Sequence, residues 1–193
     1  MKYNNGRLHD YFLHLLISRQ KQYLMVFAII STLLLMATVF STKAKATEVP
    51  RTGPDLHKLW HNKCASCHGH SAEFSRKFLR VSEGKLIGPL HADNLKLFLF
   101  NHYPSGKEVD GIYNMLLAQA STQPRFQQEC SDCHGIASEF VRESLILRDG
   151  ELLSRKLQSS TSSFLGSHRG LSAEDVEFFV EQLTRIANEI YRP

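Results

Sequence analysis

The sequence predicts a mainly α-helical fold made of two tandem small modules behind an N-terminal export or anchor helix. Three observations lead to this prediction. A shift of 66 residues lays the second half of the chain on the first, an apolar stripe at helical spacing runs through residues 176–190, and residues 24–40 form an uncharged apolar run. The boundaries expected from these patterns are a basic segment at 1–23, the apolar run at 24–40, a linker at 41–54, module one at 55–120 and module two at 121–193.

Residues 24–40, LMVFAIISTLLLMATVF, follow the basic segment and carry no charge. Their length is at the lower end of the roughly 17–25 residues that cross a bilayer as a helix. The triplet Ala44-Lys45-Ala46 further along matches a signal peptidase site. The segment is therefore either an export signal cleaved after Ala46 or a retained membrane anchor. Both alternatives place residues 47–193 outside the cytoplasmic membrane, because the basic flank stays inside.

The positive charge of the chain belongs to its N-terminal part. The whole chain has a formal net charge of +4, but residues 1–46 hold six Lys/Arg and one Asp. Residues 47–193 hold 17 Lys/Arg and 18 Asp/Glu. The basic pI therefore does not indicate a nucleic acid as partner, and the near-neutral exported part does not predict a partner of either charge.

The first helix is expected at residues 55–63, where Leu56, Leu59 and Trp60 share one helical face. It leads into the first of two C-x-x-C-H motifs, which contain the only four cysteines of the chain. This motif is the attachment signature of c-type haem. Two thiols three positions apart on a turn can each bond to one haem vinyl group, and the histidine that follows can bind the iron. The motifs thus predict two covalently bound haem c groups, held by Cys64, Cys67, Cys130 and Cys133, with His68 and His134 as proximal iron ligands.

Zinc and disulfides are the alternatives for these cysteines. Zinc ribbons space their cysteine pairs by about 15–20 residues, whereas 62 residues separate Cys67 from Cys130. A zinc ribbon also does not require a histidine after each pair, and both motifs have one. Two disulfides are a further option for an exported chain.

The repeat suggests the sixth iron ligands, because His102 falls on His168 in the 66-residue shift. Module two has no methionine and no histidine besides His134 and His168. Either His168 is the distal ligand or that iron lacks a strong sixth side-chain ligand, unless a histidine of module one reaches across. The repeat then favours His102 as the distal ligand of the first haem. The competing residues in module one are Met115, His91, His70, His57 and His61, and both favoured histidines could instead be surface residues.

After each motif, two short apolar runs flank a turn, at Glu83-Gly84 and at Asp149-Gly150. This pattern predicts a short β-hairpin in each module, with a helical turn over residues 75–80 as the competing interpretation. Four phenylalanines of the two modules could line the haem pockets or simply pack in the core. They are Phe74, Phe98, Phe140 and Phe164.

The last helix is predicted to start at a capping box, Ser172 to Asp175. Its apolar stripe follows: Val176, Phe179, Val180, Leu183, Ile186, Ala187 and Ile190. Residues 105–108 offer the same start in module one. Each proposed distal histidine therefore lies in a loop three or four residues before a capped helix.

The tandem C-A-S-C-H and C-S-D-C-H motifs resemble those of dihaem c-type cytochromes, and the later histidines resemble the bis-histidine members of that group. The resemblance covers about residues 55–193. It implies two cytochrome c-like haem modules that transfer electrons on the periplasmic side of a bacterial cytoplasmic membrane. The implied partners are redox proteins, such as a quinol-oxidising or terminal oxidoreductase, with membrane association through residues 24–40 if these are not cleaved.

Two alternatives to an electron carrier remain open. A small peroxidase or reductase would need one five-coordinate iron, as would a haem protein that binds a gas. No residue pattern predicts a catalytic acid or base beside either haem. Arg76 and Arg142, which match across the repeat, could pair with haem propionates or lie solvated on the surface.

Overall fold

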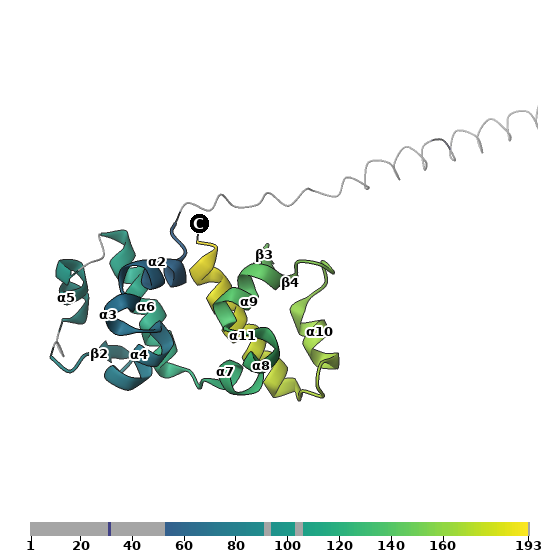
Figure 1. Ribbon diagram of the computed structural model, residues 1–193. Coiled ribbons are helices and arrows are strands. Elements are labelled where there is room, and N and C mark those ends of the chain that lie inside the picture. Colours follow the sequence, from purple (N-terminus) through teal and green to yellow (C-terminus); the bar gives the residue numbers. More distant parts are fainter. Residues whose placement is uncertain (1–30, 32–52, 91–93, 103–105, 193) are drawn as a thin grey trace, which may run out of the picture. The chain divides into compact units, whose positions relative to one another are not determined.

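The computed structural model describes residues 53–90, 94–102 and 106–192, together with Ser31. The chain divides into two units, Met1–Lys45 and Ala46–Pro193. The second unit is mainly helical with two small antiparallel hairpins, so the predicted fold class is confirmed at that level (Figure 1). The predicted N-terminal helix and linker lie outside the described residues, apart from helical Ser31 and residues 53–54. Within the described part of the chain, no helix is long and apolar enough to cross a membrane.

Module one contains five described helices and one hairpin. In chain order they are α2 (Leu56–Lys63), α3 (Ala65–His68), α4 (Ser71–Phe78), β1 (Arg80–Ser82), β2 (Lys85–Ile87), α5 (Leu95–His102) and α6 (Lys107–Ser121).

Module two repeats this order. Its elements are α7 (Arg125–Glu129), α8 (Ser131–His134), α9 (Ala137–Ser144), β3 (Leu145–Arg148), β4 (Glu151–Ser154), α10 (Thr161–Ser167) and α11 (Ala173–Ile190). The first residues of α3, α4, α5 and α6 each lie 66 positions before those of α8, α9, α10 and α11. The sequence repeat is therefore also a repeat of structure.

Both hairpins form around the predicted turns. β1 pairs with β2 and β3 with β4, with Ser82 opposite Lys85 and Arg148 opposite Glu151. The two residues inside each turn have positive φ, from 50° at Glu83 to 79° at Gly150, which is the conformation of a two-residue hairpin turn. The competing helical turn exists as well, because α4 continues to Phe78 before the strand begins.

Each module has its own hydrophobic core. In module one α6 packs against α2, α4, α5 and the hairpin, and in module two α11 packs against α9, α10 and the second hairpin (Figure 1). Trp60 and Phe126 occupy equivalent buried positions, at 5% exposure each. All residues of both cores lie within 56–191. Among the described residues, neither core therefore includes a residue of Met1–Lys45.

The predicted helix starts differ in outcome. Ser172 caps α11, and its hydroxyl and the Asp175 carboxylate form the reciprocal bonds of a capping box, as expected. The start predicted at residues 105–108 is wrong in detail, because the residue before α6 is Gly106, which provides no side-chain cap. Ser105 itself lies outside the described residues. A glycine at this position, with φ +44°, allows a turn that other residues rarely adopt.

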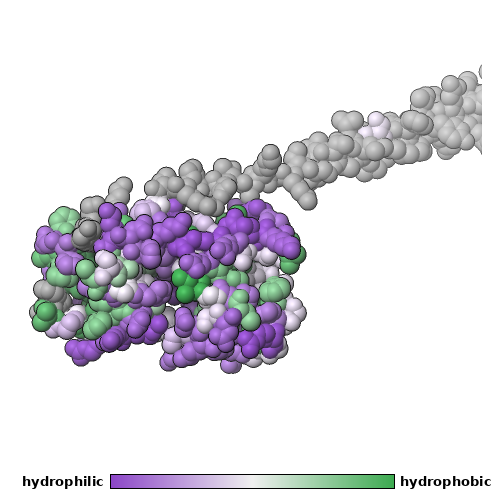
Figure 2. Space-filling view, viewed as in Figure 1, coloured by the Kyte–Doolittle hydropathy of each residue, from purple (hydrophilic) through white to green (hydrophobic). Residues whose placement is uncertain are grey.

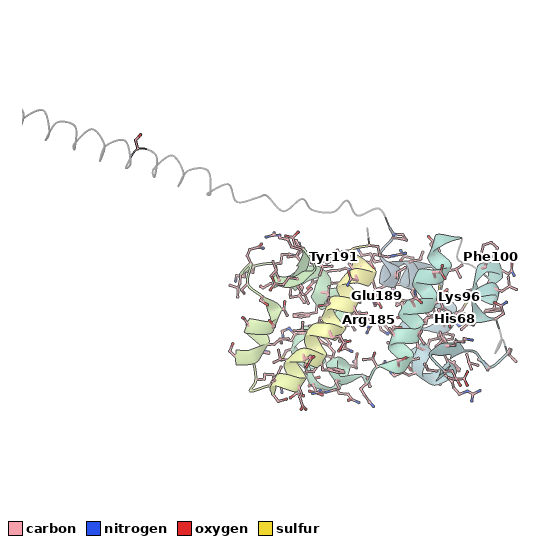
Figure 3. All side chains as sticks on the ribbon, turned by 180° about the vertical axis from the view of Figure 1, so that it is seen from behind. His68, Lys96, Phe100, Arg185, Glu189 and Tyr191 are labelled. Carbon is pink, nitrogen blue, oxygen red and sulfur yellow. The ribbon has the colours of Figure 1, made fainter. Side chains whose placement is uncertain are left out.

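Two groups of ion pairs join the modules. The Arg142 guanidinium on α9 donates to both carboxylate oxygens of Asp55, at 2.8 and 3.2 Å. The second group is centred on Glu189, which is 8% exposed. One carboxylate oxygen lies 2.8 Å from the His57 Nε2 on α2, and the other accepts a bond of 2.7 Å from Arg185 on α11. Arg185 and Glu189 lie about one turn apart on α11, on the side toward module one (Figure 3).

Asp55 also caps α2, because its side chain accepts from the backbone amides of His57 and Lys58. Burial raises the pKa of this carboxyl, but hydrogen bonds from Arg142 and from the Lys58 amide outweigh that effect. The net pKa of Asp55 is therefore below its ordinary value, and the carboxylate is held in its charged form.

Candidate haem sites

The two C-x-x-C-H motifs have the same backbone geometry. Cys64 ends α2 and caps α3, and its carbonyl accepts from the amides of Cys67 at 3.2 Å and His68 at 2.9 Å. The Cys130 carbonyl accepts from Cys133 and His134 at 3.2 and 3.0 Å. One turn of helix thus brings both cysteines and the histidine of each motif to one place, which is what attachment of a single group by two thiols requires.

A glycine ends each of these turns. Gly69 has φ +68° and Gly135 has φ +64°, and each donates its amide to the carbonyl four residues earlier, at 2.8 Å. With ψ at −156° and −144°, both glycines have an extended conformation of positive φ that glycine adopts far more readily than other residues, and it turns the chain away just after the histidine.

The four cysteines are free thiols. Burial raises the pKa of Cys64 and Cys130, and the negative charge of Glu129 adds to this effect for Cys130. Among the residues that the structure describes, no group of three or more His, Cys, Asp and Glu side chains could hold a metal ion. The two cysteine pairs therefore do not converge as a zinc site, and they form no disulfide.

Each proximal histidine faces the histidine predicted as its distal counterpart. The ring centres of His68 and His102 are 6.1 Å apart, with an angle of 62° between the ring planes. The ring centres of His134 and His168 are also 6.1 Å apart, with an angle of 57°. The structure brings together, in both modules, two imidazoles that are 34 residues apart in the chain.

This separation fits two imidazoles on opposite sides of one metal ion. A metal–imidazole bond is about 2.0 Å long, and the ring centre lies about 1 Å further away, so two such rings have centres about 6 Å apart. Direct packing between two rings allows shorter separations, down to about 4.5 Å. The residues present thus suit a haem iron between each histidine pair, with the cysteines of the same motif beside it.

Each histidine ring also contacts a phenylalanine. Phe74 and Phe140 meet the proximal rings of His68 and His134 at 4.7 and 4.6 Å between centres. On the distal side, Phe98 is stacked on His102 at 4.8 Å and 21°. Phe164 is stacked on His168 at 5.1 Å and 26°. The four predicted phenylalanines therefore lie at the two histidine pairs, where they restrict rotation of the imidazoles.

Of the two predicted distal ligands, His168 lies in the segment between α10 and α11, as expected from the sequence, whereas His102 lies within a helix end and not in a loop. His102 is the last residue of α5, and His168 caps the end of α10. Each stacks on the phenylalanine one helical turn before it. The spacing F-x-x-x-H, present in both modules, is the sequence signal for this arrangement.

The competing ligands of module one have other surroundings. Met115 is 1% exposed in the core, His57 contacts Glu189, and the ring of His70 accepts a hydrogen bond from the amide of Ala72. His61 is exposed on α2. His91 lies outside the described residues.

Two further features were not predicted. The Trp60 indole N–H donates to the Gly69 carbonyl at 2.9 Å, and its ring centre lies 6.0 Å from that of His68, so Trp60 braces the first motif. Arg142 is bonded to Asp55, a carboxylate of the chain itself.

Comparison with known proteins adds no relative: no family model matches the chain, and no curated protein or solved structure is similar to it.

Proposed function

We propose that this chain is a dihaem c-type electron carrier in which both irons are bound by two histidines. The observation that carries the proposal is the histidine pair at 6.1 Å beside a C-x-x-C-H turn, found in both modules. A single pair at this distance could arise by chance. Two pairs in equivalent positions, each with the same two phenylalanines, favour a function that needs this arrangement in both modules.

The residues of each module have distinct roles in this proposal. Cys64 and Cys67, and likewise Cys130 and Cys133, hold one haem covalently through their sulfur atoms. His68 and His134 are the proximal ligands, and His102 and His168 are the distal ones. The haem iron, when bound, supplies one-electron redox chemistry.

An electron carrier is favoured over a haem enzyme because a histidine stands on each side of both candidate iron positions. If both histidines of each pair bound the iron, no open position would remain for substrate or gas. Imidazole as sixth ligand gives a lower potential than the thioether of methionine. The phenylalanines hold the imidazoles in fixed orientations, which limits the rearrangement that accompanies a change of iron charge.

The proposed setting follows from the N-terminal sequence. We propose that residues 47–193 work on the periplasmic side of the membrane, released or anchored, and exchange electrons with redox proteins. Haem-bearing c-type modules are expected there because their haem is attached after export.

The test uses the unit Ala46–Pro193, produced with haem attached. The protein should carry two haems, and carbon monoxide should leave the spectrum of the dithionite-reduced protein unchanged. His102→Ala and His168→Ala should each open one haem to carbon monoxide. His61→Ala, which removes an exposed histidine of α2, is the matched control and should behave as the parent protein. Carbon monoxide binding by the parent protein would overturn the bis-histidine proposal and favour a haem enzyme or a gas-binding protein.

A further inference from the structure

Module one exposes more large hydrophobic side chains than module two. Among the described residues, five are exposed in module one and two, Leu157 and Phe164, in module two. The five belong to the end of α4, the hairpin, the segment after it and α5, and together we call them the hairpin–α5 surface. They are Phe78, Val81, Leu90, Leu97 and Phe100.

The residues of this surface come from segments that meet. A Cβ atom at Gly88, just after β2, would lie 3.4 Å from the Leu95 side chain of α5 and 3.9 Å from that of Leu79, between α4 and β1. On α5, Leu95 and Leu99 are buried, whereas Leu97 and Phe100, three positions apart, face outward. Figure 3 shows Phe100 at the outer edge of module one, away from module two. Hydrophobic residues are visible on this side of the molecule in Figure 2.

Phe78 packs on Phe74, which lies at the first histidine pair, with 5.4 Å between ring centres, whereas the repeat separates the rest of this surface from the candidate haem sites. A side chain that faced the haem would be needed in both modules, as Phe98 and Phe164 are. The positions equivalent to Phe78, Leu97 and Phe100 are instead Ser144, Ser163 and Gly166 in module two. Leu90 is matched by Lys156 and Val81 by Leu147, so four of the five hydrophobic residues are specific to module one. Exposed groups of this kind mark interaction sites.

Charge differs between the modules at the same place. Lys77 and Lys85 are replaced by Glu143 and Glu151 in the 66-residue shift, and Arg80 by Ile146. Lys77 also lies over the ring of Phe78, with its Nζ 5.3 Å from the ring centre. Residues 55–120 hold eight Lys/Arg and six Asp/Glu, whereas residues 121–193 hold eight and eleven. Module one therefore combines exposed Leu and Phe with basic residues, which is the composition of surfaces that lie on anionic membranes.

We infer that the hairpin–α5 surface docks module one on an anionic phospholipid bilayer. The basic side chains match the lipid phosphates in charge, and the Leu and Phe side chains reach the boundary of the acyl region. The apolar run 24–40 precedes module one in the chain, so a retained anchor would keep this module next to the same bilayer. Such docking would fix which haem faces the membrane. The inference is independent of what the haems do.

Vesicle sedimentation with the haem-loaded unit Ala46–Pro193 tests this inference, because that unit lacks the apolar run. The vesicles are phosphatidylcholine alone or with phosphatidylglycerol. Binding should require phosphatidylglycerol and should weaken with added salt. Lys77→Gln with Lys85→Gln should weaken binding about thirtyfold, since each basic side chain near the surface accounts for about fivefold. Leu97→Ser should weaken it about tenfold.

The matched control is Arg148→Gln with Lys156→Gln, which removes two positive charges from exposed positions of module two. It should change vesicle binding by less than about twofold. Equal loss in the control would overturn the inference, because binding would then depend only on net charge. Absence of vesicle binding would also overturn it and leave a protein partner as the occupant. Dimers that form with increasing concentration and that Leu97→Ser abolishes would also overturn the inference, because the surface would then bind a second copy of the chain. Circular dichroism and the haem spectrum establish that each variant is folded.

Discussion

Replacing Glu189 with glutamine tests how the two modules are held together. Glu189 is the buried residue of α11 that contacts both His57 of module one and Arg185. Its side chain and that of His57 are 10% and 9% exposed, so water competes weakly for either. Glutamine has nearly the same shape and can still bond to both partners. The substitution thus removes the charge and leaves the packing in place.

The expected loss follows from the two hydrogen bonds. A hydrogen bond to a charged group contributes about 1.5–3 kcal/mol, against about 0.5–1.5 kcal/mol for a neutral one. Glutamine leaves the His57 bond without a charged acceptor and the Arg185 bond with one charged partner instead of two, so we expect a cost of about 1–2 kcal/mol in the free energy of unfolding. Glu189→Ala should cost about 3–4 kcal/mol, because it also leaves the His57 ring without its buried partner.

Guanidinium unfolding of the haem-loaded unit, followed by far-ultraviolet circular dichroism, gives these free energies. Glu181→Gln is the control, because it changes an exposed glutamate of the same helix, and it should alter stability by less than about 0.5 kcal/mol. If Glu189→Gln costs no more than Glu181→Gln, the buried contact does not join the modules energetically, and the reasoning fails.

Three further substitutions give defined outcomes. Asp55→Asn keeps a good helix cap but loses the ion pair with Arg142, and should cost about 1 kcal/mol at pH 7. Because the folded pKa of Asp55 is lowered, its contribution to stability is complete above the unfolded pKa of about 3.9 and is lost as pH falls through the folded pKa. The free energies of unfolding of the variant and the parent should therefore converge in acid. A constant difference in urea unfolding down to about pH 2 would contradict this. Gly69→Ala meets no clash but must adopt φ +68°, so it should lower the free energy of unfolding by about 1 kcal/mol in thermal unfolding. Gly166→Ala within α10 is the control and should be neutral or stabilising. Equal effects of the two substitutions would show that the backbone conformation is not the cause. Trp60→Phe gives module one the residue type of module two and removes the bond to the Gly69 carbonyl, so it should cost about 1 kcal/mol in chemical unfolding; an unchanged midpoint would mean that water replaces the indole without cost.

Local patterns predicted the elements well. The Ser172 capping box and the stripe after it fix α11, and the turns at residues 83–84 and 149–150 fix both hairpins. These features depend on residues close in sequence, where backbone preferences and side-chain spacing decide the outcome. The facing histidines are a long-range feature, and only the repeat made them predictable.

What the sequence could not predict depends on contacts between distant segments. The His57–Glu189 contact spans 132 residues and the Arg142–Asp55 pair spans 87. Neither has a counterpart in the repeat, so no comparison of the modules indicates them. The placement of His102 at the end of α5 was also missed, because α5 is a short helix without a strong polar–apolar pattern.

The Asp55–Arg142 pair also bears on how such a protein could grow by duplication. The contact is head-to-tail, because it joins Asp55 at the start of module one to Arg142 on α9, the third helix of module two. Contacts of this type can propagate into longer arrays. The residue equivalent to Asp55 in module two is Ser121, which has no charge to offer a following arginine. A third module placed after module two would therefore have no carboxylate at Ser121 to pair with its arginine. The first substitution needed to lengthen the array is therefore at Ser121. The Asp55–Arg142 contact already present would then set the spacing of the candidate haem sites along the extended chain.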